Sequence, residues 1–321
     1  MARVYPLTPG ANASDRVPAV TLGLFLNLLL LAVLWGSAFP GIKVGLEGLS
    51  APHLTLLRFA VASLCFAPYL MLKRRRLLPE REDLPYFFLL GLLGITVYHL
   101  ALNFGQAQVT AGAASLIIAT APAITAVVAY FLIGDRLPVL GWLGIFVSFA
   151  GVSLIVMGDN PELGFNPWAL LILVSAVTTA FYAVLQKRMF ARYSAVQVTA
   201  FSTWAGTLPL LVFLPGLPAD LADAGLAPLL WTVYIGVFPA AFAYAQFSYA
   251  ISVAPVTLVA AYLYMVPVFS LLFAWLVLGE LPTPLTLLGG AVAIVGIVLV
   301  NHAKRRSRER SPALVAAEKG A

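Results

Sequence analysis

Hydrophobic positions along this chain form long unbroken runs instead of the spaced stripes of a soluble helix. A helix of about 20 apolar residues crosses the hydrocarbon core of a bilayer. The pattern therefore predicts an all-α polytopic membrane protein with ten transmembrane helices. The expected spans are Val20–Ile42, Pro52–Leu72, Leu84–Gln106, Ala111–Ile133, Val139–Met157, Pro167–Gln186, Ala195–Leu214, Ala227–Ala250, Pro255–Leu278 and Pro284–Asn301.

One part of the pattern occurs twice. Residues 122–154 and 267–299 each contain an apolar helix, a Gly-acid turn and a second apolar helix, at an offset of 145 residues. Pro122 corresponds to Pro267, and Asp135 corresponds to Glu280. A unit of five helices is odd, so its second copy must lie upside down, which predicts two inverted five-helix repeats. The expected segments are a cytoplasmic N-terminal segment 1–19, repeats 20–157 and 167–301, an external linker 158–166, and a basic, disordered cytoplasmic tail 302–321.

Charge supports this count of helices. With the N-terminus in the cytoplasm, 17 of the 19 Lys and Arg residues fall in predicted cytoplasmic segments, as the positive-inside rule requires. Hydrophobic residues make up 61% of the chain and charged residues only 10%, which excludes a soluble protein. The net charge of +6 is then explained by membrane orientation, and no nucleic-acid partner is expected. The first apolar run is too long for the core of a cleaved signal peptide.

Uncharged polar residues mark a candidate site. No Asp or Glu lies in the middle of a predicted span, which argues against a carboxylate relay for protons. His99, Asn103 and Gln106 are spaced four and three residues apart, so they share one face of the third helix. An offset of 143 matches LNFGQA with AQFSYA and gives the second copy Phe242, Gln246 and Tyr249.

The sixth helix carries a similar polar stripe, formed by Ser175, Thr178, Thr179, Tyr182 and Gln186. Lipid cannot hydrogen-bond such groups, so they should face protein or water. Contact between helices explains the Ser and Thr residues equally well. His99 is open to two interpretations, a packed histidine and a proton carrier. Arg58, toward the outer end of the second helix, is interpreted as snorkelling or bonding a carbonyl group.

Aromatic residues complete the candidate pocket: Trp35, Phe39, Tyr98, Tyr262 and Tyr264. An apolar, aromatic pocket with a few uncharged polar groups suits small amphipathic solutes. It does not suit a strongly anionic solute, which would need fixed cations. Three prolines within predicted spans are expected to kink their helices: Pro122, Pro239 and Pro267.

Small residues and missing motifs narrow the alternatives. Helices five and ten carry glycines that permit close packing, within the chain or in a homodimer: Gly141, Gly144, Gly151, Gly289, Gly290 and Gly296. No motif of a hydrolase, a metalloprotease or a nucleotide-binding loop is present. The three histidines are scattered along the chain. We therefore expect no enzyme, no cofactor and no metal site.

Ten spans in two halves resemble the EamA-type transporters of the drug/metabolite transporter superfamily. The stretch WGSAFPGIK (Trp35–Lys43) and the proline-to-Gly-acid signature in both halves are similar to that family, and the resemblance covers Val20–Val300. It implies a metabolite exporter of the bacterial inner membrane, most like the aromatic amino acid exporters. It also implies a central cavity lined by helices one, three, four, six, eight and nine, with helices five and ten at the periphery.

The lining residues implied on this chain are Trp35, Phe39, Tyr98, His99, Asn103, Gln106, Tyr182, Gln186, Phe242, Gln246, Tyr249, Tyr262 and Tyr264. The prediction is an alternating-access exporter of neutral, amphipathic amino acids in the lipid bilayer, with both termini cytoplasmic. Its oligomeric state is left as monomer or homodimer. Two alternatives stay open: a carrier of other metabolites or cationic drugs, and a non-transporting membrane enzyme or scaffold.

Overall fold

The computed structural model describes residues 22–75, 77–133, 138–159, 166–254, 259 and 262–318, and the regular structure of these residues is helical. The first half contains α1 (Leu22–Leu46), α2 (Ala51–Leu72), the short η1 (Arg81–Asp83), α3 (Leu84–Gly91), the π-helical segment η2 (Leu92–Val97), α4 (Tyr98–Gln108), α5 (Ala111–Ile118), α6 (Ala121–Ile133) and α7 (Val139–Asp159).

The second half repeats this order with the same kinds of segment. It contains α8 (Ala169–Leu185), η3 (Gln186–Ala191), α9 (Ala195–Leu210), η4 (Leu211–Phe213), α10 (Leu217–Asp223), α11 (Leu226–Ile235), the π-helical segment η5 (Gly236–Phe242), α12 (Ala243–Val253), α14 (Met265–Leu278) and α15 (Pro284–Glu318). The Asp135 turn, the N-terminal segment 1–19, most of the linker 158–166 and the start of the ninth span lie outside the described residues.

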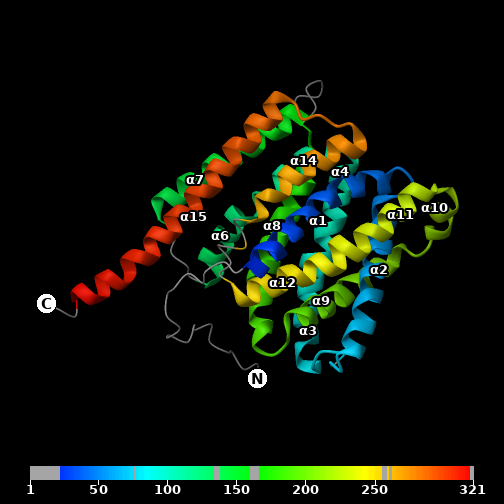
Figure 1. The fold of residues 1–321 in the computed structure, drawn as a ribbon, viewed down its shortest axis with the longest axis horizontal. Helices are drawn as coiled ribbons and strands as arrows, with labels where there is room; N and C mark the ends of the chain where they lie inside the picture. Colours follow the sequence, from blue (N-terminus) through cyan, green and yellow to red (C-terminus); the bar gives the residue numbers. More distant parts are fainter. Residues whose placement is uncertain are drawn as a thin grey trace.

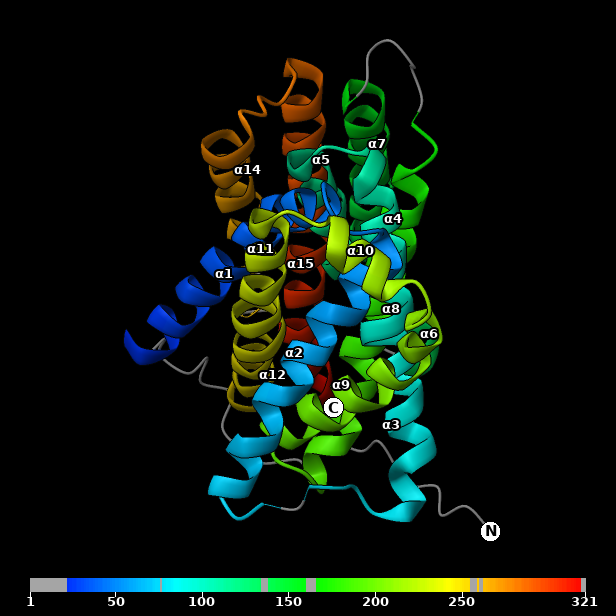
Figure 2. The same cartoon turned by 90° about the vertical axis from the view of Figure 1, so that its right-hand side faces the viewer.

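The helices form a membrane-spanning bundle, as predicted. In the described part, eight helical spans are long and apolar enough to cross a membrane, and Met265–Leu278 and Pro284–Val300 are shorter apolar helices. The helices are seen together in Figure 1. In Figure 2 the connection from α2 to α3 lies at the bottom and that from α14 to α15 at the top. These are the loops predicted to lie on opposite sides of the membrane.

Helices α7 and α15 lie side by side along one edge of the bundle (Figure 1). A Cβ atom on Gly144 would lie 2.5 Å from the Gly296 oxygen, and one on Gly151 would lie 2.6 Å from the Gly289 oxygen. The first contact therefore joins the start of α7 to the middle of α15, and the second joins the middle of α7 to the start of α15. The two helices are antiparallel, and because they hold the same place in the two halves, the repeats are inverted. These glycines pack within the chain, not against a second copy.

At two of the prolines predicted to kink a helix, Pro122 and Pro267, the structure has a turn followed by a new helix. Ala119 and Thr120 form a turn between α5 and α6, so Pro122 is the second residue of a new helix. In the ninth span Tyr264 is a turn residue and Pro267 lies in the first turn of α14. Proline lacks the amide hydrogen that a first turn leaves unbonded, so it suits the start of a helix better than its interior.

The expectation of a disordered tail is wrong for most of its length, because α15 continues to Glu318. The spanning part of the helix removes the cost of nucleation. Arg, Glu and Ala, which are frequent in this segment, have high helix propensities and extend the helix.

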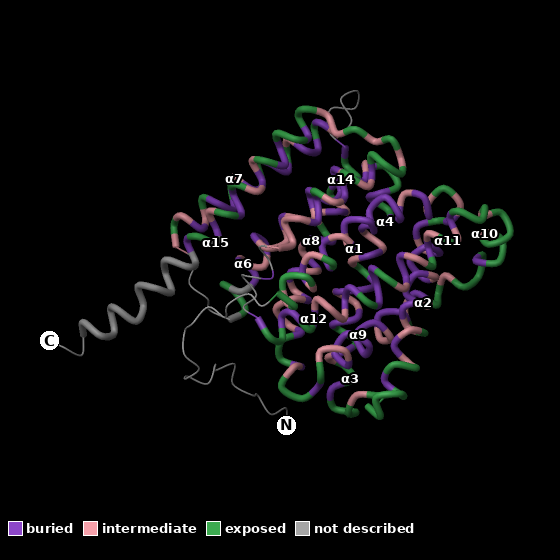
Figure 3. Tube along the Cα trace, in the orientation of Figure 1, coloured by how far each residue is buried: buried purple, intermediate pink, exposed green. Residues whose placement is uncertain are grey.

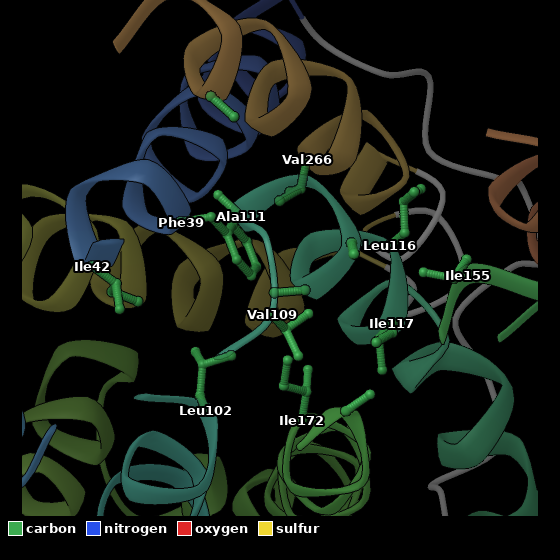
Figure 4. Packing of buried hydrophobic residues seen from close by; sticks show 14 of the residues in the cluster. Phe39, Ile42, Leu102, Val109, Ala111, Leu116, Ile117, Ile155, Ile172 and Val266 are labelled. Carbon is green, nitrogen blue, oxygen red and sulfur yellow. The ribbon is translucent and has the colours of Figure 1, made fainter. Parts of the chain in front are cut away.

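Both halves share one hydrophobic core. Figure 4 shows part of it, where Phe39 and Leu102 of the first half lie in the same buried cluster as Ile172 and Val266 of the second. Figure 3 places buried residues in the bundle interior and exposed residues on the outward faces of α7 and α15. Since a buried apolar cluster crosses the boundary between the repeats, separating the halves would expose it to solvent or lipid.

Candidate functional site

Two π-helical segments occupy equivalent places in the repeats. The second-half segment η5 starts 144 residues and ends 145 residues after η2, and α12 follows α4 by 145 residues at both ends. Segments of this kind are frequent at functional sites. The predicted offset of 143 for this region is therefore wrong by two residues. A likeness of sequence letters suggested it, whereas the helix boundaries follow the offset of the glycine and proline signature.

The corrected offset makes Tyr244, not Phe242, the equivalent of His99. The His99 Nε2 atom lies 3.0 Å from the Tyr244 hydroxyl. When a residue touches its own repeat equivalent, the contact lies on the pseudo-two-fold axis that relates the repeats. Phe242 and Tyr249 are 49% and 51% exposed, and neither belongs to this buried contact.

The predicted polar face of α4 is buried. His99, Asn103 and Gln106 are each at most 1% exposed. Asn103 Nδ2 donates to Thr55 Oγ1 at 2.8 Å, and Gln106 Nε2 donates to the Phe39 carbonyl oxygen at 2.7 Å. Both side-chain amide oxygens, Asn103 Oδ1 and Gln106 Oε1, are buried without a hydrogen-bond partner.

Two glutamines of the second half repeat this condition. Gln186 is fully buried with neither amide atom bonded, and Gln246 is half-buried with its Oε1 atom unbonded. A buried polar atom without a partner is uncommon in a protein and needs an explanation. Reversible binding of a ligand by these atoms is one such explanation.

Arg58, interpreted from the sequence as snorkelling or bonding a carbonyl group, lies in the interior of the bundle. Its side chain is 2% exposed, which excludes snorkelling to the membrane surface. The guanidinium carbon lies 5.5 Å from the centre of the Phe59 ring, and Nη1 lies 3.4 Å from His99 Nδ1. Its position seven residues inside an apolar span was the sequence signal for a functional role, because an ionisable residue within a membrane helix is by default a candidate functional residue.

Aromatic side chains lie next to Arg58, His99 and Tyr244. The Trp35 ring lies 5.4 Å from the Tyr244 ring, and Trp35 Nε1 donates to the Pro239 oxygen at 3.2 Å. Pro239 itself is inside η5, so this predicted kink coincides with a π-helical segment. Tyr98 is half-buried next to His99, with 4.4 Å between the ring centres.

Tyr182 belongs to the same buried cluster as Tyr244, whereas the two tyrosines of the ninth span lie elsewhere. Tyr182 is 2% exposed, and its ring lies so close to Gly94 that an added Cβ atom would be 2.6 Å away. Tyr262 contacts Phe25 at 5.9 Å between ring centres. Tyr264 packs with a cluster of residues from α6, α7 and α15. The two tyrosines of the ninth span therefore do not share one pocket wall.

Polar contacts tie the chain together at both ends of the bundle. At the end predicted to be cytoplasmic, Arg192 pairs with Glu80 and Asp83, and the Tyr193 hydroxyl donates to Asp83 Oδ2 at 2.7 Å. At the other end, Glu280 accepts a hydrogen bond from the Ala111 amide at 2.9 Å. Burial raises the pKa of Glu280. These contacts join the two repeats at both ends of the bundle.

Comparisons with known proteins agree with this architecture. The profile of the EamA-like transporter family matches residues 22–157 and 166–302. The chain is 37% identical to "Uncharacterized transporter YdfC" of Bacillus subtilis, over 86% of this chain and 90% of that protein. It is 38% identical to "Probable terminal-alkyne amino-acid exporter" of Streptantibioticus cattleyicolor, over 86% and 92%.

More distant relatives extend the pattern. "Uncharacterized inner membrane transporter YedA" of Escherichia coli K12 is 28% identical, over 88% of this chain and 92% of that protein. A crystal structure with 19% sequence identity superposes with a TM-score of 0.63, covering 88% of this chain and 97% of that chain. That structure supports the fold alone. The two matched segments span nearly all of the helical bundle, and the chain therefore belongs to the EamA-like transporter family, whose members are membrane transporters and not enzymes.

Proposed function

We propose that this chain exports neutral, amphipathic amino acids, aromatic ones among them, across the inner membrane of a bacterium by alternating access. The observation that carries the proposal is the group of buried amide atoms without partners on α4, η3 and α12. The rings of Tyr98 and Tyr244 lie on two of these helices, α4 and α12, and the Trp35 ring lies 5.4 Å from the Tyr244 ring. Amides would bond the polar end of an amino acid, and rings would contact its side chain.

Two further observations support the proposal. A relative of 38% identity is named as an exporter of an amino acid, and another is named as an inner membrane transporter. Inverted repeats and broken helices are common features of alternating-access carriers. With no acidic residue in the middle of a predicted span, we favour facilitated diffusion or exchange over strong proton coupling. The predicted cytoplasmic termini belong to the same proposal.

Counterflow in proteoliposomes tests the function. Vesicles loaded with unlabelled phenylalanine should accumulate labelled phenylalanine, tyrosine, tryptophan, methionine or threonine with saturable kinetics. Gln246→Ala should reduce the initial rate at least fivefold, because the substrate would lose its hydrogen bond to the Gln246 amide oxygen, which has no partner within the protein. Gln108→Ala is the matched control, since that side chain is exposed at the end of α4. If the folded wild-type protein exchanges no amino acid, the proposal is wrong.

A further inference from the structure

One charged group of the bundle interior has no part in the proposal so far. Arg58 lies seven residues after the start of α2, or about 10 Å along the helix axis at 1.5 Å per residue. Its side chain is 2% exposed, and a guanidinium group stays protonated in proteins. A full positive charge is therefore held inside the bundle.

This charge has no acidic partner among the described residues. The carboxylates that form ion pairs there are Glu80, Asp83 and Asp220, and their partners are Arg192 and His53. The Arg58 Nε atom is buried without any hydrogen-bond partner. A buried cation without a counter-charge is strongly unfavourable. An anionic group that occupies the site during part of the cycle would offset that cost.

The neighbours of Arg58 leave it free to bind an anion. Guanidinium nitrogens only donate, so His99 Nδ1, 3.4 Å from Arg58 Nη1, must be an acceptor. His99 is then neutral, and its Nε2–H donates to the Tyr244 oxygen at 3.0 Å. The Tyr244 hydroxyl hydrogen is left available. Arg58 and Tyr244 therefore both offer donors at the contact between His99 and Tyr244.

Acceptors lie further along the same face of α4. Thr55 Oγ1 donates to the Ala51 oxygen, so only the Nδ2 group of Asn103 can donate to Thr55. Likewise only an N–H group can meet the Phe39 carbonyl contacted by Gln106. The free atoms of Asn103 and Gln106 are thus both oxygens. Donors around Arg58 and the Asn103 oxygen, four residues or about 6 Å along α4 from His99, suit the carboxylate and the ammonium group of a zwitterion.

From this arrangement we propose that Arg58 is the carboxylate anchor of the substrate site, with Tyr244 as a second donor to the same carboxylate. The inference rests on the proposed function, which it sharpens: a substrate must carry a carboxylate, whereas an ammonium group alone is not sufficient. With Arg58 in the site, the pocket contains a fixed cation, contrary to the expectation from the sequence. Residue 203, the equivalent of Arg58 in the second repeat, is a fully buried threonine, so only one repeat supplies the cation.

Two analogues of phenylalanine, each lacking one charged group, test the anchor. In counterflow of labelled phenylalanine with the full chain, 3-phenylpropionate should compete and phenethylamine at equal concentration should not. Arg58→Gln should weaken the apparent affinity for phenylalanine at least tenfold and abolish the preference between the analogues. Arg58→Lys should keep the preference with lower affinity, because it keeps the charge and loses the planar fork. Arg188→Gln is the matched control, an exposed guanidinium 5.4 Å from the Tyr86 ring centre.

The outcomes separate the two proposals. If wild-type protein exchanges phenylalanine but phenethylamine competes better than 3-phenylpropionate, the anchor is wrong and the function stands. The same holds if folded Arg58→Gln keeps the wild-type preference. If no amino acid exchanges, the function fails. Thermal stabilisation of the detergent-solubilised protein by 3-phenylpropionate, present in the wild type and lost in Arg58→Gln, then still supports an anion site, and its absence from the wild type overturns it. Where Arg58→Gln does not fold, Arg58→Lys and the wild-type preference decide.

Discussion

The imidazole of His53 has an acceptor at each ring nitrogen. Nδ1 lies 2.5 Å from Asp220 Oδ2, and Nε2 lies 2.9 Å from the Phe213 carbonyl oxygen. The Ser50 hydroxyl also lies 3.0 Å from Nδ1. The hydrogen bond from His53 lowers the pKa of Asp220 to about 2. This pair joins the start of α2 to α10, a connection outside the central group.

The Asp220 pair predicts a pH-dependent contribution to stability. A carboxyl whose folded pKa is lowered from 3.8 to about 2 stabilises the fold above its unfolded pKa, and this contribution is lost as the pH falls toward 2. Solvent screening of a partly exposed pair limits it to about 1 kcal/mol. Asp220→Asn should therefore lower Tm in detergent at pH 6, and the difference from the wild type should shrink between about pH 4 and pH 2. An undiminished difference at the lowest pH would show that the ionised carboxylate is not the cause.

Side chains differ in how well the sequence predicts them. The helical period placed His99, Asn103 and Gln106 on one face, and that face is buried. Burial of Arg58 was not predictable in the same way, because snorkelling depends on which neighbours cover the helix. Tyr244 was missed since the letters around Gln246 favour the wrong offset. The lining roles of Phe242, Tyr249 and the other predicted residues remain predictions.

At the scale of elements, hydropathy predicted helices better than their interruptions. The expected span Val139–Met157 is α7, Val139–Asp159. The π-helical segment η2 contains no proline, so nothing in its apolar sequence signals that the backbone bonding changes there. Prolines did mark the breaks before α6 and α14. The seven-residue α10 is too short and polar to give a hydropathy signal.

Close packing of α7 and α15 predicts a strong effect of one methyl group. In Gly151→Ala the added Cβ would lie 2.4 Å from the Ala293 amide nitrogen. The backbone cannot yield without separating the helices, so we expect a loss of about 1–3 kcal/mol, measured as a lower unfolding temperature in detergent. Gly23→Ala is the control, because no atom lies within 4 Å of the added Cβ. Equal unfolding temperatures for the two variants would contradict the tight packing.

At the scale of the whole molecule, the two repeats are joined at both ends of the bundle. Arg192 of the second repeat pairs with Asp83 and Glu80 of the first, and Glu280 of the second repeat bonds the start of α5 in the first. Alternating access requires that one set of contacts break while the other holds. In this structure the contacts at both ends are formed, so opening at either end would require that its own set break.

The single cysteine reports on opening at the Arg192 end. Cys65 is half-buried and packs against the core cluster that contains Tyr193. Arg192→Gln and Asp83→Asn should each favour opening at this end, and the rate of Cys65 labelling by a water-soluble maleimide should rise severalfold. Glu47→Gln, a charge change at the opposite end of the bundle, serves as control. Labelling rates unchanged in both variants would mean that these ion pairs do not hold the end closed.

The buried Arg58 cation, next to the His99–Tyr244 contact on the pseudo-two-fold axis, bears on how such a chain can arise. A half-length protein inserted in both orientations would assemble as a homodimer with two identical residues at this place. Two guanidinium groups there would repel each other, and two threonines would leave no charge. Two copies that evolve independently, as the halves of this chain can, allow arginine at position 58 and threonine at position 203. If Arg58 anchors the substrate, duplication and divergence preceded selectivity for carboxylates, and a chain built from two copies of the first repeat should fold poorly.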